Sequence, residues 1–214
     1  MSLRFKKNIN YNAIIGLWEI DSGILASSSH LNLSDNQIKR LRLFGTDRKR
    51  TEFLSVISLI GSLLDVDHPV EVKHEANGKP FLDGIDYNIS ITHSGKFVAV
   101  LLSKDEVPGI DIERVSEKIV RIEDKFMNDD EMKSAALERE YINEHKVLVW
   151  TTKEALFKFY GEGKVIFKEN LLVEPFKFEG KGVIGASIMM NDIDKRFDVH
   201  YEKIEDYILT YVLG

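Results

Sequence analysis

Two short motifs contain the residue types in this chain that could do chemistry. Asp111 and Glu113 lie in GIDIE, residues 109–113, while Glu154 and two lysines, Lys153 and Lys158, lie in WTTKEALFK, residues 150–158. Residues two apart in a strand face the same side, and residues four apart in a helix share a face. Carboxylates are ligands that a hard divalent cation prefers, and lysines suit phosphate oxygens. The two motifs therefore indicate metal-assisted chemistry on a phosphorylated substrate.

Each motif also has an ordinary structural interpretation. Asp111 and Glu113 would be two solvated acids if their strand were exposed, and Glu154 with Lys158 would then be a surface ion pair worth about 0.3–0.5 kcal/mol. The helix around Glu154 is apolar on nearly every side, which predicts burial. A buried glutamate needs a partner, and a metal held jointly with Asp111 and Glu113 would supply one.

Two residues upstream have an anion-binding character. His93 ends a predicted strand beside Ser94 and Gly95, and Lys79 lies on the tight turn GKP, residues 78–80. An imidazole next to turn amides suits a phosphate oxygen. A structural histidine and a solvated turn lysine are the alternatives.

The hydrophobic pattern predicts the elements that position these residues. A helix is expected over 47–64 with Asp47 as its N-cap, and glycines 161 and 163 should end a helix over 144–160. Two further helices are expected, over 118–126 and 129–143. Turns are expected at 77–80 and at Ser94–Gly95, the second of which joins a hairpin. Strands are expected over 12–20, 70–74, 87–93, 96–102, 109–115, 171–178, 182–190, 197–203 and 207–213.

The chain contains a weak internal repeat. Residues 87–102 and 197–213 both consist of an aromatic-led strand, a polar turn and an apolar strand. Each of these segments ends one half of the chain, and each half consists of a strand, a helical region and further strands. We therefore predict two related α+β lobes, residues 1–107 and 108–214.

The composition limits the class of protein. The absence of cysteine excludes disulfides and thiolate metal sites, which fits a reducing cytosol. Residues 1–10 are polar and basic with no apolar run after them, and the longest apolar stretch, 56–64, is too short for a membrane span. We expect a cytoplasmic protein without membrane association. A net charge of −6 argues against nucleic-acid binding.

One segment of this acidic chain is locally basic. It is either a solvated helix face or an anion site. Its members are Lys39, Arg40, Arg42, Arg48, Lys49 and Arg50.

Taken together, the motifs resemble the 4'-phosphopantetheinyl transferases of the Sfp type. The family pattern is matched in order and spacing by GKP (78–80), SITHS (90–94), GIDIE (109–113) and WTTKEALFK (150–158). The resemblance covers roughly residues 45 to 180. Thr92 replaces the usual serine, Lys164 replaces a usual leucine, and the helix after Arg50 lacks further arginines that many relatives have.

The resemblance implies a fold and a reaction. The fold is two similar α+β lobes related by a pseudo-twofold axis, with the active site in the cleft between them. The reaction transfers the 4'-phosphopantetheine arm of coenzyme A to a serine of an apo acyl or peptidyl carrier protein and releases 3',5'-ADP. The enzyme would be of the holo-[acyl-carrier-protein] synthase type and would need Mg²⁺.

The resemblance also assigns roles in the reaction centre. Asp111, Glu113 and Glu154 match the residues that hold Mg²⁺ against the pyrophosphate. Glu154 is also the expected base for the carrier serine, directly or through water. Lys153 and Lys158 would neutralise the pyrophosphate and the leaving group.

Further residues match the family's coenzyme A ligands. His93 and Thr92 would contact the region of the 3'-phosphate, and Lys79 the nucleotide. One of Arg48 and Arg50 would be a further phosphate ligand. Glu131 resembles a family acid that supports the site.

Two other functions would explain part of the pattern. A catalytically inactive relative that binds carrier protein or coenzyme A need not keep all the acids and Lys158. An unrelated phosphohydrolase would explain the acids but not the ordered lysine and histidine motifs. The carrier protein is not determined by the sequence. A basic segment at 39–50 would steer an acidic carrier, and a chain with two lobes permits a monomer.

Overall fold

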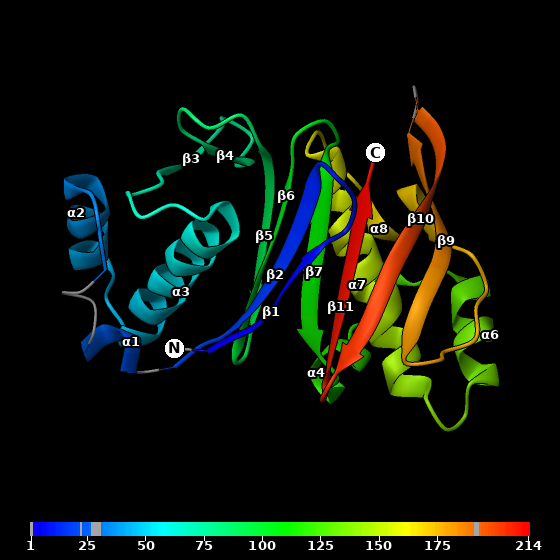
Figure 1. Ribbon diagram of the computed structural model, residues 1–214. Coiled ribbons are helices and arrows are strands. Elements are labelled where there is room, and N and C mark those ends of the chain that lie inside the picture. Colours follow the sequence, from blue (N-terminus) through cyan, green and yellow to red (C-terminus); the bar gives the residue numbers. More distant parts are fainter. Residues whose placement is uncertain (1, 22, 27–30, 191–192) are drawn as a thin grey trace. The chain divides into compact units, whose positions relative to one another are not determined.

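The chain forms two compact units in the computed structural model, which describes residues 2–21, 23–26, 31–190 and 193–214. The units are Met1–Val107 and Pro108–Gly214. Each contains one antiparallel sheet and one long helix that packs on it (Figure 1).

The N-terminal unit is built on a six-stranded sheet in the order β1-β2-β6-β5-β4-β3. β6 is buried at every position and lies between β2 and β5, which makes it the centre of this sheet. β5 and β6 form the predicted hairpin, with Gly95 at φ 55° in its turn. The strands are β1 (Ser2–Asn8), β2 (Ala13–Glu19), β3 (Val72–His74), β4 (Pro80–Leu82), β5 (Asn88–Ser94) and β6 (Phe97–Ser103).

The long helix of this unit is α3 (Asp47–Leu64), which packs on β2 and β6. Its bounds are those predicted. Its N-cap is Thr46 rather than Asp47, because the Thr46 hydroxyl accepts the Lys49 N–H at 3.4 Å while Asp47 begins the helix. Asp65, at φ 57°, ends it. Two helices precede it, α1 (Gly23–Ala26) and α2 (Asp35–Leu43).

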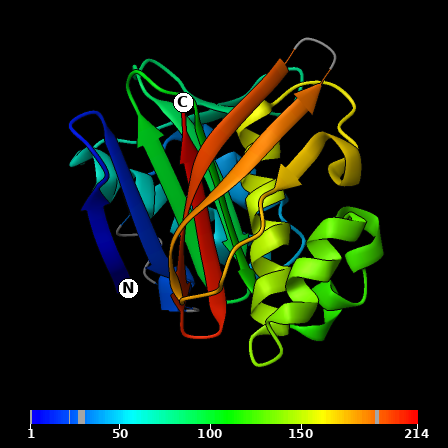
Figure 2. The ribbon, with the colours of Figure 1, turned by 90° about the vertical axis from the view of Figure 1, so that its right-hand side faces the viewer.

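The C-terminal unit has a five-stranded sheet in the order β7-β11-β10-β9-β8. Its long helix, α7 (Ile142–Tyr160), packs on β7 and β11, and shorter helices lie beside α7 (Figure 2). The strands are β7 (Pro108–Arg114), β8 (Leu171–Val173), β9 (Lys181–Met190), β10 (Ile193–Ile204) and β11 (Tyr207–Leu213). The shorter helices are α4 (Glu117–Val120), α5 (Glu123–Phe126), α6 (Asp129–Leu137) and α8 (Phe167–Asn170).

The two units repeat one topology. In each, a first strand leads to the long helix, four strands follow in order, and the last strand pairs with the first: β6 with β2, and β11 with β7. The repeated hairpin seen in the sequence is β5–β6 and β10–β11. The α+β class and the similarity of the two halves are thereby confirmed. The N-terminal sheet has one extra strand, β1, at its edge.

Several elements differ from those predicted. The helix expected over 118–126 is two short helices, α4 and α5, and the helix expected over 129–143 ends at Leu137. The strand expected over 171–178 ends at Val173. β1 and α2 were not predicted. β1 is an edge strand of mostly exposed, polar residues, so it lacks the apolar alternation by which a strand is recognised.

Among the described residues, no helix combines the length and the low polarity that crossing a membrane requires.

Candidate active site

The first two acids lie on β7, where the strand alternation places them as expected. Ile110 and Ile112 are fully buried on one side of the strand, and Asp111 and Glu113 lie on the opposite side, on which α7 packs. Asp111 is only 4% exposed, and Glu113 is half-buried. Asp111 is therefore the more desolvated acid of the two.

The long helix α7 brings a third acid and a lysine to this strand. The Lys158 ammonium donates to Asp111 Oδ1 at 2.7 Å and to the Ile110 carbonyl at 3.0 Å. α7 comes close to β7 because Gly109 has no side chain: a Cβ there would lie 2.1 Å from the Ala155 carbonyl oxygen. The Lys158 contact with Asp111 is thus an ion pair between two elements rather than a pair within one helix.

The electrostatics of Glu154 show that the acids share one environment. The pKa of Glu154 is raised to about 7: burial is the largest cause, the charges on Asp111 and Glu113 also raise it, and Lys158 opposes them. The carboxylates of β7 therefore raise the pKa of Glu154 by more than Lys158 lowers it. A cation among these carboxylates would remove this conflict.

The carboxylates do not form a complete metal cage in this structure. Within the described ranges, no three His, Cys, Asp or Glu side chains are grouped as a metal site would require. The donor set nevertheless fits Mg²⁺, because Asp111, Glu113 and Glu154 offer hard oxygen ligands and carry excess negative charge.

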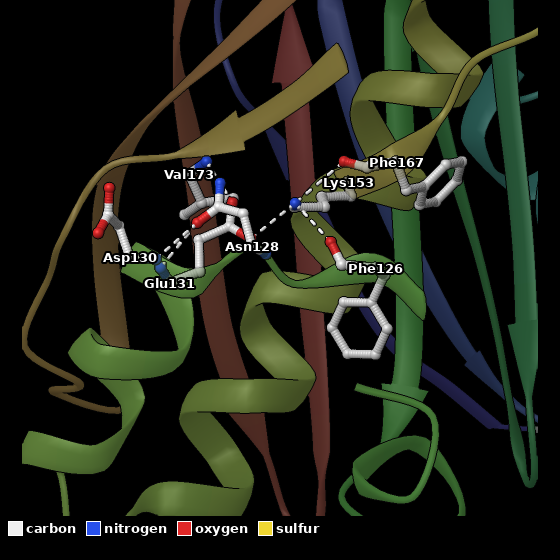
Figure 3. Close-up of polar contacts among 7 residues, drawn as sticks. All are labelled: Phe126, Asn128, Asp130, Glu131, Lys153, Phe167 and Val173. Atoms are coloured by element: carbon white, nitrogen blue, oxygen red, sulfur yellow. Dashed lines mark hydrogen bonds and ion pairs between the residues drawn. The ribbon is translucent and has the colours of Figure 1, made fainter. Parts of the chain in front are cut away.

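Lys153 lies elsewhere than the sequence match implies. Its ammonium is completely buried and donates to Glu131 Oε2 at 2.8 Å and to the carbonyls of Phe126 and Phe167 at 2.6 and 3.1 Å (Figure 3). Those three bonds use its three N–H donors. This burial does not fit the expectation that Lys153 neutralises the pyrophosphate, and of the two lysines it is Lys158 that lies beside Asp111.

Glu131 is the partner that holds Lys153. It is 4% exposed, it caps α6 by accepting the Asn128 N–H at 2.9 Å, and its other oxygen accepts the Val173 N–H at 2.9 Å. The residue expected to support the site therefore joins α6, α7 and β8.

In the N-terminal unit, Arg48 and His93 meet at a glutamate. Arg48 Nε lies 2.8 Å from Glu52 Oε1, and His93 Nδ1 lies 4.0 Å from the same oxygen. Arg50 instead pairs with Asp47 at the start of α3, at 2.7 Å. Of the two arginines, Arg48 is thus the one placed with His93. Sequence reasoning missed Glu52, although its spacing of four from Arg48 on a predicted helix is a usable signal.

Two further residues of this unit are less well placed for a ligand. Thr92 is 5% exposed, while the neighbouring His93 side chain is 51% exposed, because adjacent strand residues face opposite sides. Thr92 therefore does not share the exposed face of His93. Lys79 is half-buried on the tight turn before β4, where Gly78 takes φ 89° and the Lys79 N–H donates to Asn77 Oδ1 at 3.0 Å.

Comparison with known proteins agrees with these features. Residues 108–212, almost all of the C-terminal unit, match the family model of the 4'-phosphopantetheinyl transferase superfamily. The chain is also similar to the 4'-phosphopantetheinyl transferase gsp of Aneurinibacillus migulanus, with 31% identity over an alignment 157 residues long. That alignment covers 58% of this chain and 65% of the relative, so the match spans slightly less than two thirds of the relative's length. Through its C-terminal unit, the chain is similar to the 4'-phosphopantetheinyl transferase superfamily.

Proposed function

We propose that the protein transfers 4'-phosphopantetheine from coenzyme A to a serine of an apo acyl or peptidyl carrier protein, in an Mg²⁺-dependent reaction that releases 3',5'-ADP. The observation that carries the proposal is the placement of Glu154 and Lys158 of α7 against Asp111 of β7, within the unit that matches the superfamily.

The chemistry follows from these residues. The carrier serine oxygen forms a bond to the phosphorus that bears the pantetheine arm, and the bond from that phosphorus to the bridging oxygen of 3',5'-ADP breaks. Glu154, with its pKa near neutrality, is suited to take the serine proton. Mg²⁺, held by Asp111, Glu113 and Glu154, would neutralise charge on the pyrophosphate.

Other residues bind and orient. Lys158 is half-buried beside Asp111, and its ammonium would share its charge with the leaving phosphate. In the N-terminal unit, Arg48 and His93 would bind a coenzyme A phosphate, which would compete with Glu52 for both side chains. We include Lys79 as a nucleotide ligand on the sequence match alone. The proposal places the reaction in the cytoplasm, with the protein acting as a monomer.

Incubation with coenzyme A, Mg²⁺ and a panel of apo carrier proteins tests the proposal, with the mass of the carrier as readout. The mass should rise by one pantetheine arm, and chelation with EDTA should stop the change. Glu154→Gln and Asp111→Ala should each lower the rate at least 100-fold, since each removes a metal ligand. Glu202→Gln is the control, because Glu202 belongs to an exposed ion pair with Lys181 of the same unit.

The alternative is a relative that binds carrier protein or coenzyme A without catalysis. Calorimetry separates the two functions: the enzyme should bind coenzyme A more tightly when Mg²⁺ is present. Folded protein that modifies no carrier in a broad panel and binds coenzyme A equally well with EDTA would contradict the proposed transfer.

A further inference from the structure

We propose that Glu131 and Lys153 are positioning residues for the reaction: their buried ion pair fixes the rotation of α7 and thereby places Glu154 and Lys158 against Asp111. The inference rests on the proposed function for its kinetic consequences. Its structural part rests on the contacts of the pair itself.

The pair is fully engaged on both sides. Lys153 has no exposed surface, and its three N–H donors meet three oxygens at 2.6 to 3.1 Å. Glu131 accepts two backbone N–H groups, those of Asn128 and Val173, besides the Lys153 ammonium. Neither side chain is therefore available to a substrate, so any contribution to the reaction acts through other residues.

The contacts tie α7 to four other segments. Phe126 ends α5, Asn128 precedes α6, Phe167 begins α8 and Val173 ends β8 (Figure 3). Three acceptors from three of these segments meet at one ammonium on α7. A side chain held from several directions resists both rotation and sliding of the helix that bears it.

A second anchor holds the opposite side of the same turn. Ala155 packs against Gly109 of β7, with no room for a Cβ between them. On an α-helix, successive residues are about 100° apart, so Lys153 and Ala155 lie about 160° apart around the axis, with Glu154 between them. A rotation of about 20° would move the Glu154 carboxylate by about 2 Å. Displacements of this size are enough to impair a reaction that depends on positioning.

The pair is not required simply to fill the core. Burial lowers the pKa of Lys153, and Glu131 opposes that shift, so the charged form depends on its partner. Replacement of a buried ion pair by apolar residues of similar volume is often neutral for stability. The pair therefore fits a role in fixing one arrangement of the helix better than a role in filling the core.

Single and double substitutions test the inference. Glu131→Gln and Lys153→Met each leave one buried polar partner uncompensated, and both should lower the melting temperature. The double variant removes both charges and should recover most of that loss. Its kcat should remain at least 50-fold below that of the unmodified protein, with the KM for the carrier within about threefold. A purely structural role predicts instead that kcat recovers with the melting temperature.

Lys203→Met is the matched control. Lys203 pairs with Glu144 in the first turn of α7 at 2.8 Å, almost three turns from Glu154. This variant loses an ion pair to the same helix and should keep kcat within about twofold. A double variant with kcat near that of the unmodified protein, or an equal loss in Lys203→Met, overturns the inference.

Mg²⁺ binding to the protein without coenzyme A, measured by calorimetry, gives a readout separate from activity. The double variant should bind Mg²⁺ at least tenfold more weakly, because its carboxylates are displaced. If no carrier is modified by the unmodified protein, the proposed function fails while this measurement still decides the positioning. The inference is contradicted if the double variant binds Mg²⁺ as tightly as the unmodified protein does. It is also contradicted if the unmodified protein does not bind Mg²⁺.

Discussion

At the scale of single residues, Glu154 combines a functional position with a cost in stability. Its carboxyl is half-buried beside Asp111 and Glu113, and its pKa is raised to about 7. In the unfolded chain the same group titrates near 4.5, its ordinary value. Between these pH values the folded state holds a proton that the unfolded state has lost. The contribution of Glu154 to stability is therefore full below about pH 4.5 and is lost as the pH rises through 7.

Glu154→Gln should consequently stabilise the metal-free protein at alkaline pH. Glutamine resembles the protonated form and does not ionise, so the free energy of unfolding should rise by about 2 kcal/mol at pH 8 relative to the unmodified protein. Denaturant unfolding in EDTA across pH 4.5 to 8 measures the difference, which should shrink towards zero at the acid end. A difference that is constant across this range would show that the charge of Glu154 is not its cause.

At the scale of elements, two glycines control how closely the long helices approach their sheets. In β7, Gly109 faces the backbone of α7; in β2, Gly16 faces the ends of Leu59 and Leu63 of α3, which a Cβ would meet at 2.7 and 2.8 Å. Backbone cannot move aside locally, whereas leucine side chains change rotamer. The two positions should therefore differ in their tolerance of a methyl group.

Gly109→Ala should destabilise the protein by about 3 kcal/mol, and Gly16→Ala by about 1 kcal/mol, because overpacking costs more against a rigid neighbour. Chemical denaturation of both variants measures this. Gly109→Ala should also lower transferase activity at temperatures at which the variant is still folded, since α7 carries Glu154. Equal losses of stability in both variants would contradict the role of the Ala155 carbonyl.

The same scale shows how far the sequence alone leads. Long periodic elements were predictable: α3 has the predicted bounds, and both hairpins were identified. Helices α4, α5 and α8 are four residues each, which is too short for a helical repeat of apolar residues to be recognised in the sequence. Whether such short segments form helices depends on their tertiary contacts. The acids on β7 and α7 followed from strand and helix geometry. The burial of Lys153 was not predicted, because its partner Glu131 is 22 residues away in the sequence. The signal that could have indicated it is that Val149 and Leu156, on the same face of the helix, are apolar.

At the scale of the whole molecule, the basic segment of the N-terminal unit stands out on a chain of net charge −6. Not all of its members are equally free. Arg40 donates to the Val72 carbonyl at 3.3 Å and lies over the Phe53 ring, while Lys39 and Lys49 are exposed. If the proposed carrier is acidic, these two lysines would steer its approach.

Lys39→Glu combined with Lys49→Glu should lower kcat/KM for an acidic apo carrier about fivefold at low salt, and the difference should vanish near 0.5 M salt. Each substitution changes the charge by −2, so the net charge becomes −10. Lys177→Glu with Lys181→Glu makes the same change in the C-terminal unit and is the control. If both pairs lower the rate equally, total charge rather than the basic segment governs the encounter.

The repeated topology has a consequence for the order of events during synthesis. In each unit the strand that precedes the long helix pairs with the last strand, β2 with β6 and β7 with β11, so neither sheet is complete until its final strand has been made. β6 ends at Ser103 and β11 at Leu213. At about 5–20 residues per second, the ribosome needs several seconds or more to translate the intervening chain. The candidate phosphate ligands Arg48 and His93 can therefore be in place on a nascent chain whose candidate metal ligands still lack their sheet.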